Sequence, residues 1–300
     1  MAELRAYSTR ARITPTSFVN DYAWGGFKGN ADAWMERYSD AFLYLANSGT
    51  HVLKLRLPSR LLDPESARAY CGGQSASVVE KSGKVILSFL SHDEEGGEWV
   101  EGDGRLSSLI AVRAELACRD LRALYLGWLL RAQSSELDDE DREPPVPPGL
   151  GQLSASLRGL AEFLRIDGDL LQVAAQASAP LQDLRSRRDE VQAWVATLPT
   201  PEKDDLIASL IVDADRARVA ELTQRFLEGR RGGSTADSVT RRTVGELRHT
   251  AEAYAEVRRR IELEKQTREK TRRQREAAAA HVLRRGAERS TCRPPARRRL

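Results

Sequence analysis

The clearest strand pattern in the first third of the chain is His51-Val52-Leu53-Lys54-Leu55-Arg56-Leu57. Leucine occupies every second position, and the two cations stand between the leucines. Successive side chains of a β-strand point to opposite faces, so this alternation predicts a strand with Leu53, Leu55 and Leu57 buried and with Lys54 and Arg56 exposed. A β-sheet is therefore expected near the N-terminal end.

Two runs further along the chain are also rich in strand-forming residues. Ala76–Glu80 and Lys84–Leu90 flank Lys81-Ser82-Gly83, and a short glycine-containing turn between two such runs predicts a β-hairpin. Between the first strand and the hairpin, Pro64–Tyr70 is expected to form a short helix. Asp63 is its N-cap candidate, and a proline in the first turn of a helix is favourable.

Two longer helices are expected in the same part of the chain. After the N-cap candidate Asn30, one apolar helix face is predicted by three- and four-residue spacing of Trp34, Met35, Tyr38, Phe42 and Leu45. Residues 106–133 are expected to form a single buried helix, because residues 121–130 are apolar on nearly all sides. These elements together predict an α+β domain over residues 1–135.

A glycine-rich loop before the first of these helices contains Tyr22, Trp24 and Phe27. Helical packing does not explain aromatic residues in a loop. They could stack on nucleic-acid bases or anchor a peptide, or they could close the end of a hydrophobic core. We favour the last interpretation.

The second part of the chain is predicted to be helical throughout. Residues 136–149 contain an acidic run and four prolines, which predict an exposed, semi-rigid linker. Residues 150–229 are expected to form an all-α bundle. Its helices are predicted near residues 152–165, 169–179, 181–198, 201–213 and 215–228.

The third part is a long basic helix, the arm, expected over residues 239–285 and followed by a disordered basic tail over residues 286–300. A narrow apolar stripe at helical spacing consists of Val244, Leu247, Ala251, Tyr254, Val257 and Ile261. Residues 264–276 contain no apolar side chain. The fold class expected for the chain is thus an α+β N-terminal domain, then an all-α helical domain and a long C-terminal basic helix, with helix predominating.

The charge of the chain is unevenly distributed. It has 47 Lys and Arg and 44 Asp and Glu among 300 residues, a net charge of +3. Residues 235–300 contain 19 basic and 9 acidic side chains, whereas residues 1–234 have a net charge of −7. A basic arm on an acidic domain suggests that the arm binds an anionic partner, or the acidic surface of the chain's own preceding domain.

Known catalytic and phosphate-binding patterns are absent from the sequence. Gly25–Gly29 and Lys81–Lys84 fit neither GxGxxG nor GxxxxGK[ST]. His92 stands beside Asp93, but neighbours in sequence do not converge as a Ser-His-Asp triad does, and no second histidine cluster completes a metal site. We predict no catalytic, metal-binding or cofactor-binding residue.

The location expected for the protein is the cytoplasm. The three cysteines are far apart and form no CxxC pair, which is typical of a reducing compartment. The first residues contain no apolar segment of signal-peptide length, and Leu121–Leu130 is too short to span a membrane.

Three functions stay open at this point. The first is an interaction or scaffold protein that binds a partner, or a second copy, through the apolar stripe within residues 239–263, as a coiled coil does. The second is nucleic-acid binding through residues 258–285, with Arg268, Arg272, Arg273 and Arg275 as contacts. The third is an enzyme of unrecognised type in the N-terminal domain. Glutamates alternate with the arginines in the sequence, and for this reason assembly is favoured.

Overall fold

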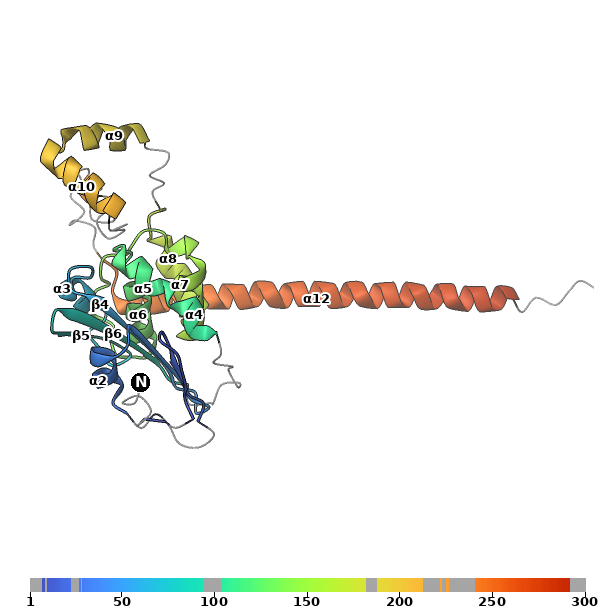
Figure 1. Ribbon diagram of the computed structural model, residues 1–300. Coiled ribbons are helices and arrows are strands. Elements are labelled where there is room, and N and C mark those ends of the chain that lie inside the picture. Colours follow the sequence, from blue (N-terminus) through green and yellow to red (C-terminus); the bar gives the residue numbers. More distant parts are fainter. Residues whose placement is uncertain are drawn as a thin grey trace, which may run out of the picture. The chain divides into compact units, whose positions relative to one another are not determined.

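A computed structural model describes residues 7–8, 10–22, 27, 29–93, 104–181, 188–212, 222, 225–226 and 241–291. The chain divides into two compact units, residues 1–248 and residues 249–300. The first unit contains two β-sheets near its N-terminal end, followed by a succession of helices, and a long helix, α12, ends the described chain (Figure 1). This order confirms the predicted fold class.

The larger sheet has four antiparallel strands in the order β3-β4-β6-β5. The strands are β3 (Ala41–Leu45), β4 (His51–Pro58), β5 (Ala76–Lys81) and β6 (Lys84–Ser91). The second sheet pairs only β1 (Arg12–Ile13) with β2 (Phe18–Val19). The predicted hairpin is confirmed. Ser82 and Gly83 join β5 to β6 with φ of 52° and 70°, as a two-residue hairpin turn of type I′ requires.

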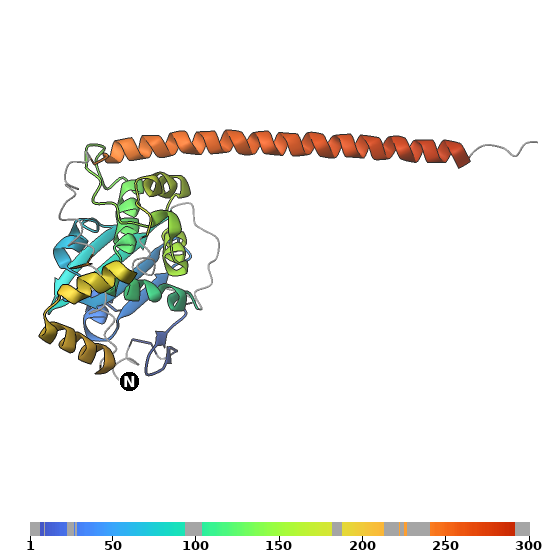
Figure 2. The same cartoon turned by 90° about the horizontal axis from the view of Figure 1, so that it is seen from above.

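The leucine face of β4 is buried, as the alternation predicts. Leu53, Leu55 and Leu57 are at most 1% exposed. The register places Leu53 opposite Phe89 and Leu55 opposite Leu87, so the buried side chains of β4 and β6 share one face. Helices α5 (Ala111–Ala117) and α6 (Arg122–Gln133) pack on the sheet, and Figures 1 and 2 show them grouped with the other green helices on one side of it.

The other face of β4 corrects the sequence analysis, because Lys54 and Arg56 are not exposed. Their side chains are only 12% and 14% accessible, under helix α2 (Ala31–Arg37). The ammonium group of Lys54 donates to the carboxylate of Asp32 at 2.7 Å. Arg56 donates to the carbonyl oxygen of Met35 at 2.6 Å. The aliphatic part of each side chain lies between sheet and helix, while its charged end reaches a partner at the edge.

The helix predicted after Asn30 is correct only in its first half. Asn30 caps it, with its side-chain oxygen accepting from two backbone N–H groups. The helix then ends at Tyr38, and Ala41–Leu45 is strand β3. The correction has a physical reason: this segment pairs with β4 along its whole length, and Phe42 and Tyr44 suit a strand at least as well as a helix.

An aromatic cluster covers α2. Trp34, which is 4% exposed, has its ring centroid 4.7 Å from Tyr7, 4.9 Å from Phe18 and 5.4 Å from Phe27. Phe27 also contacts Phe42, with centroids 5.5 Å apart. The loop residue Phe27 therefore closes a core, as favoured above. Trp24 lies outside the described residues.

The long helix predicted over residues 106–133 is wrong as a single element. It consists of α4 (Arg105–Leu109), α5 and α6. The break before α6 centres on Arg119, which has a φ of 58°, and on Asp120, whose carboxylate accepts from the backbone N–H of Arg122 at 3.1 Å. From Arg122 to Ala132, every side chain except that of Arg131 is buried, as the apolar sequence of α6 predicts. The short helix α3 (Pro64–Arg68), capped by Asp63, is confirmed.

The helices after residue 149 are present, but they do not begin a separate bundle. They are the 3-10 turn η1 (Leu150–Gln152), α7 (Ala155–Phe163), α8 (Gly168–Gln176), α9 (Arg188–Thr197) and α10 (Thr200–Val212). Helix α7 packs against α4, α5 and α6. The helix predicted over residues 215–228 lies almost entirely outside the described residues.

The expectation of an exposed linker over residues 136–149 is wrong for several of its residues. Glu143, Pro144 and Pro147 are buried. Glu136 accepts from the backbone N–H of Ser75 at 2.6 Å, and the hydroxyl of Tyr70 donates to the carbonyl of Pro145 at 2.7 Å. The segment is held by these contacts with the α+β part, which proline and charge content alone do not reveal.

Helix α12 (Val244–Thr291) has 48 residues, about 72 Å at 1.5 Å per residue. It begins five residues later than predicted and extends six residues beyond Arg285, so the disordered tail expected from residue 286 is wrong for residues 286–291. Alanine and arginine are strong helix formers, and the chain has no proline between Pro201 and Pro294 to end the helix earlier.

Candidate functional site

The base of α12 is fixed by a capping box. The backbone N–H of Thr243 donates to the carboxylate of Glu246 at 2.8 Å, and the N–H of Glu246 donates to the hydroxyl of Thr243 at 3.2 Å. This reciprocal pair satisfies two backbone donors that have no partner within the helix. The sequence Thr-x-x-Glu is its signature, so this start was available to sequence analysis and was missed.

A buried carboxylate binds Arg242, the residue just before the N-cap Thr243. Glu143, 3% exposed, accepts from Nε and Nη2 of Arg242, each at 2.9 Å, and from the hydroxyl of Tyr125 on α6. The pKa of the Tyr125 hydroxyl is raised, first by burial and then by the charge of Glu143 beside it. Glu143 and Arg242 are 99 residues apart, and no sequence signal pairs them.

Arg248 makes the third set of contacts that hold the base of α12. Its guanidinium donates to the carbonyl oxygen of Ala132 at 2.6 Å and to the carboxylate of Asp139 at 2.7 Å. Val244 and Leu247 beside it are fully buried. The first turn of α12 is therefore an integral part of the first unit.

The structure divides the predicted apolar stripe in two. Val244, Leu247 and Ala251 are buried, at 0%, 0% and 7% exposure. Tyr254, Val257 and Ile261 are 39%, 44% and 47% exposed. The last three define the exposed apolar stripe of α12, and the first three contribute to the fold of the chain itself.

The cationic part of α12 is solvent-exposed. Every described side chain from Glu256 to Glu276 is exposed, including those of Arg268, Arg272, Arg273 and Arg275. Arg273 pairs with Glu269 at 2.6 Å and Arg272 with Glu276 at 3.6 Å, both one turn apart along the helix. The side chain of Arg268 makes no ion pair or hydrogen bond with the part of the chain that the structure describes, and neither does that of Arg275.

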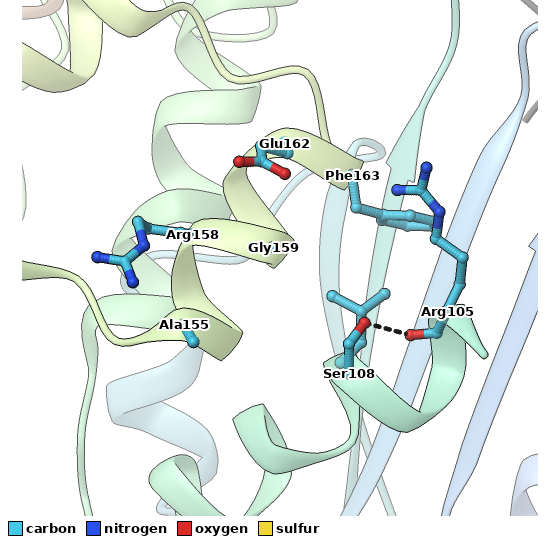
Figure 3. A pocket seen from close by; sticks show the side chains of 8 residues that line it. Arg105, Ser108, Ala155, Arg158, Gly159, Glu162 and Phe163 are labelled. Atoms are coloured by element: carbon cyan, nitrogen blue, oxygen red, sulfur yellow. Dashed lines mark hydrogen bonds between the residues drawn. The ribbon is translucent and has the colours of Figure 1, made fainter.

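A small cavity lies elsewhere in the first unit, between α4 and α7. It has a volume of about 290 Å³ and is lined by Arg105, Ser108, Leu109, Ala155, Arg158, Gly159, Glu162 and Phe163. The Ser108 hydroxyl donates to the carbonyl of Arg105 at 2.8 Å, within its own helix (Figure 3). Arg105 lies beside the Phe163 ring, whereas Arg158 points away from it (Figure 3). The two cations therefore do not converge on one bound group.

His51 is the buried histidine of the sheet. Its Nδ1 lies 2.9 Å from the carbonyl oxygen of Phe163 and its Nε2 lies 3.1 Å from Nη2 of Arg165. A neutral ring that donates through Nδ1 and accepts at Nε2 satisfies both contacts. Burial is the main cause that lowers the pKa of His51, and the nearby charge of Arg165 lowers it further. These contacts tie β4 to the end of α7.

Among the residues described, no group of three or more His, Cys, Asp or Glu side chains is placed to hold a metal ion. Within the same ranges, no helix is both long and apolar enough to cross a membrane.

The observations define an α+β protein that carries a long, charged C-terminal helix with a short exposed apolar stripe. Comparison of the chain with protein-family models, with curated proteins and with solved structures found no match.

Proposed function

We propose that the chain is an interaction protein that assembles with a second copy through α12, by packing Tyr254, Val257 and Ile261 against the same residues of that copy. The observation that carries this proposal is the exposure of these three side chains on a helix whose other described positions beyond Ala251 are nearly all polar, charged or alanine. Their three- and four-residue spacing places them on one face, as in a helix–helix seam.

The energetic gain supports a reversible interface. Burying the exposed part of each side chain contributes roughly 1 kcal/mol, about half of what full burial of such a side chain gives. Three side chains per copy also bury less area than a permanent dimer needs. We therefore expect a dimer that depends on protein concentration.

Charge selects the orientation of the pair. In a parallel pair, the cations Lys265, Arg268, Arg272 and Arg275 of one helix would lie against the same cations of the other, and like charges in an interface are unfavourable. An antiparallel pair centred near Val257 keeps the apolar residues together and moves the two cationic segments to opposite ends. The proposal is therefore an antiparallel pair.

The fixed base of α12 lowers the cost of pairing. Helix formation is limited by its first turn, and here that turn is already held by the capping box and by Arg248. The exposed residues continue a preformed helix, so association pays little for ordering the backbone.

The test is the molar mass of the full chain by light scattering, as a function of concentration and of salt. The chain mass is 33.4 kDa. We expect the wild type to approach twice this mass as concentration rises, with little effect of salt, and the variant Val257→Gln/Ile261→Gln to remain monomeric. Leu263→Gln is the matched control, because Leu263 is 65% exposed but lies about 160° around the helix from Ile261. A wild type that is monomeric throughout, or equal association of all three proteins, contradicts the proposal.

The three isolated cysteines support the cytoplasm as the site of this assembly.

A further inference from the structure

The cations of α12 are not scattered evenly around the helix. Successive side chains of an α-helix are about 100° apart, so spacings of three, four and three residues return to the same side. Lys265, Arg268, Arg272 and Arg275 have these spacings, and all lie within about 40° of the direction of Ile261. We name these four residues the cation row. All four are exposed.

The glutamates of this segment lie beside the cation row and do not interrupt it. Glu264 and Glu276 are about 60° from its centre, Glu269 about 80° and Glu262 about 100°. Glu264, Glu269 and Glu276 are each three or four residues from a member of the row, so they flank the row, and Glu276 pairs with Arg272. The row therefore forms a line of four cations on one face of α12, with glutamates on both of its sides.

Two ion pairs of the segment involve candidate contacts, one outside the cation row and one within it. Arg273 lies about 120° around the helix from the cation row. Its guanidinium pairs with the carboxylate of Glu269, so this ion pair does not involve a residue of the row. Within the row, Arg272 is paired with Glu276 at 3.6 Å, where both side chains are at least 66% exposed and water screens the attraction. Lys265, Arg268 and Arg275 have no ion-pair partner among the described residues. Lys265 therefore replaces Arg273 in the set of candidate contacts.

The chemistry of the cation row favours a phosphate backbone over a protein or a membrane. From Glu264 to Glu276 no residue is apolar, so a partner helix or a bilayer finds nothing to bury. Three of the four cations are guanidinium groups, whose planar geometry suits two hydrogen bonds to one phosphate. The row extends over about 15 Å of helix axis, enough to meet several consecutive phosphates of a nucleic acid.

We propose that the cation row binds the phosphate backbone of nucleic acid, through charge and without reading the base sequence. This surface follows the exposed apolar stripe along the same face of α12, so in the antiparallel pair it would lie opposite residues 240–250 of the other copy. The proposal therefore concerns the unpaired chain, and affinity is measured at protein concentrations where light scattering shows a monomer.

The test compares two variants of the full chain that lose equal charge. The row variant carries Lys265→Gln, Arg268→Gln, Arg272→Gln and Arg275→Gln. The off-row variant carries Arg259→Gln, Arg260→Gln, Lys270→Gln and Arg273→Gln, four cations that lie about 100° or more from the row. Glutamine is a good helix former, and circular dichroism verifies that both variants keep their helix content.

The measurement is affinity for a duplex DNA and a single-stranded RNA of arbitrary sequence, titrated with salt. Four phosphate contacts predict that wild-type affinity for the duplex falls about 100-fold between about 50 and about 200 mM salt. The off-row variant should keep most of this dependence. The row variant should lose it, with a slope flatter by about 0.9 for each contact removed.

Three outcomes overturn the proposal. One is a wild type that binds neither nucleic acid at low salt. The second is an equal loss in both variants, which would show that only total charge matters. The third is binding of an acidic polypeptide, such as polyglutamate, as tightly as nucleic acid of the same charge, which would identify a protein partner instead.

Discussion

At the scale of single residues, buried polar groups join segments that are distant in the sequence. His51 bonds to the carbonyl of Phe163 and to Arg165 across more than 110 residues. Glu143 joins Tyr125 and Arg242. Each group is satisfied by partners in the fold, as buried polar atoms must be. Both sets therefore have consequences for stability that can be measured.

The neutral state of His51 predicts a dependence of stability on pH. Its pKa in the folded chain is below the ordinary value of 6.5, so the unfolded chain binds more protons between the folded pKa and 6.5. The free energy of unfolding should therefore fall as pH decreases below 6.5 and level off below the folded pKa.

Urea unfolding of the wild type and of His51→Asn measures this effect. Asparagine keeps a hydrogen bond to Phe163 but does not titrate, so the variant should show a weaker pH dependence in the same range. Identical pH dependence in both proteins would rule out His51 as the cause.

The ion pair of Glu143 and Arg242 predicts a large cost for removing one partner. Arg242→Met leaves a buried carboxylate without its cation, which should cost about 3 kcal/mol of unfolding free energy. Arg241→Met is the matched control, since Arg241 is exposed and should lose less than about 0.5 kcal/mol. The difference is read from urea midpoints, and equal midpoints would show that the pair contributes nothing.

Periodicity in the sequence predicted which leucines of β4 are buried. It did not predict burial that depends on contacts with residues distant in the sequence. The burial of Leu53, Leu55 and Leu57 follows from alternation alone. The low exposure of Lys54 and Arg56 depends on Asp32 and Asp40, which come from α2 and the turn after it. Similarly, helical spacing alone does not show that Val244 and Leu247 are buried while Val257 is 44% exposed.

At the scale of secondary structure, the contact between α6 and the sheet requires a glycine. A Cβ atom at Gly127 would lie 2.7 Å from Cε1 of Phe89, 3.0 Å from Sγ of Cys71 and 3.1 Å from Cβ of Ala76. Phe89 and Cys71 are fully buried and cannot move without disturbing their neighbours. The close approach of the helix to β5 and β6 therefore depends on this position.

Two glycine-to-alanine changes should have opposite effects. Gly127→Ala should destabilise the chain by about 1–3 kcal/mol, because it overpacks the core. Gly159→Ala on α7, where the nearest atom to the new Cβ is 3.8 Å away, should stabilise by about 0.5–1 kcal/mol, because alanine favours the helix. Thermal unfolding measures both changes. A Gly127→Ala protein as stable as the wild type would show that α6 lies farther from the sheet than these distances indicate.

Helix boundaries were the least predictable part of the fold. Residues 106–133 have no proline, so composition predicts one helix, whereas Arg119 adopts the left-handed conformation and ends it. Residues 41–45 have helical spacing, but the ladder with β4 stabilises a strand. In both cases tertiary contacts override a local preference, which a single sequence does not show.

At the scale of the whole molecule, the segment over residues 136–149 is part of the first unit. The contacts of Glu136, Glu143 and Pro145 predict that limited proteolysis of the native chain spares this segment. Early fragments, identified by mass spectrometry, should have no end within residues 136–149. An early cut there that leaves two stable halves would support the exposed linker that the sequence alone predicts.

The order of the sheet and the long helix along the chain was predictable because each follows from a local sequence pattern. Alternating leucines define the sheet, and a long run of helix formers without proline defines α12. The division of α12 into a buried base and an exposed remainder was only partly predictable. The sequence indicates the stripe and the arginines, but the structure shows that half of the stripe is buried, and helical geometry separates Arg273 from the cation row.

The proposed antiparallel pairing of α12 can be tested by the distance between spin labels on two copies. Single labels are placed at Ala255 and, separately, at Gln274, in a chain with Cys118→Ser and Cys292→Ser. In an antiparallel pair centred near Val257, labels at 255 lie close together, and labels at 274 lie about 50 Å apart along the helix axis. Antiparallel pairing therefore predicts a short distance between labels at 255 and a long distance between labels at 274. Short distances at both positions would show a parallel pair, and the absence of any inter-copy distance would show that α12 does not pair with itself.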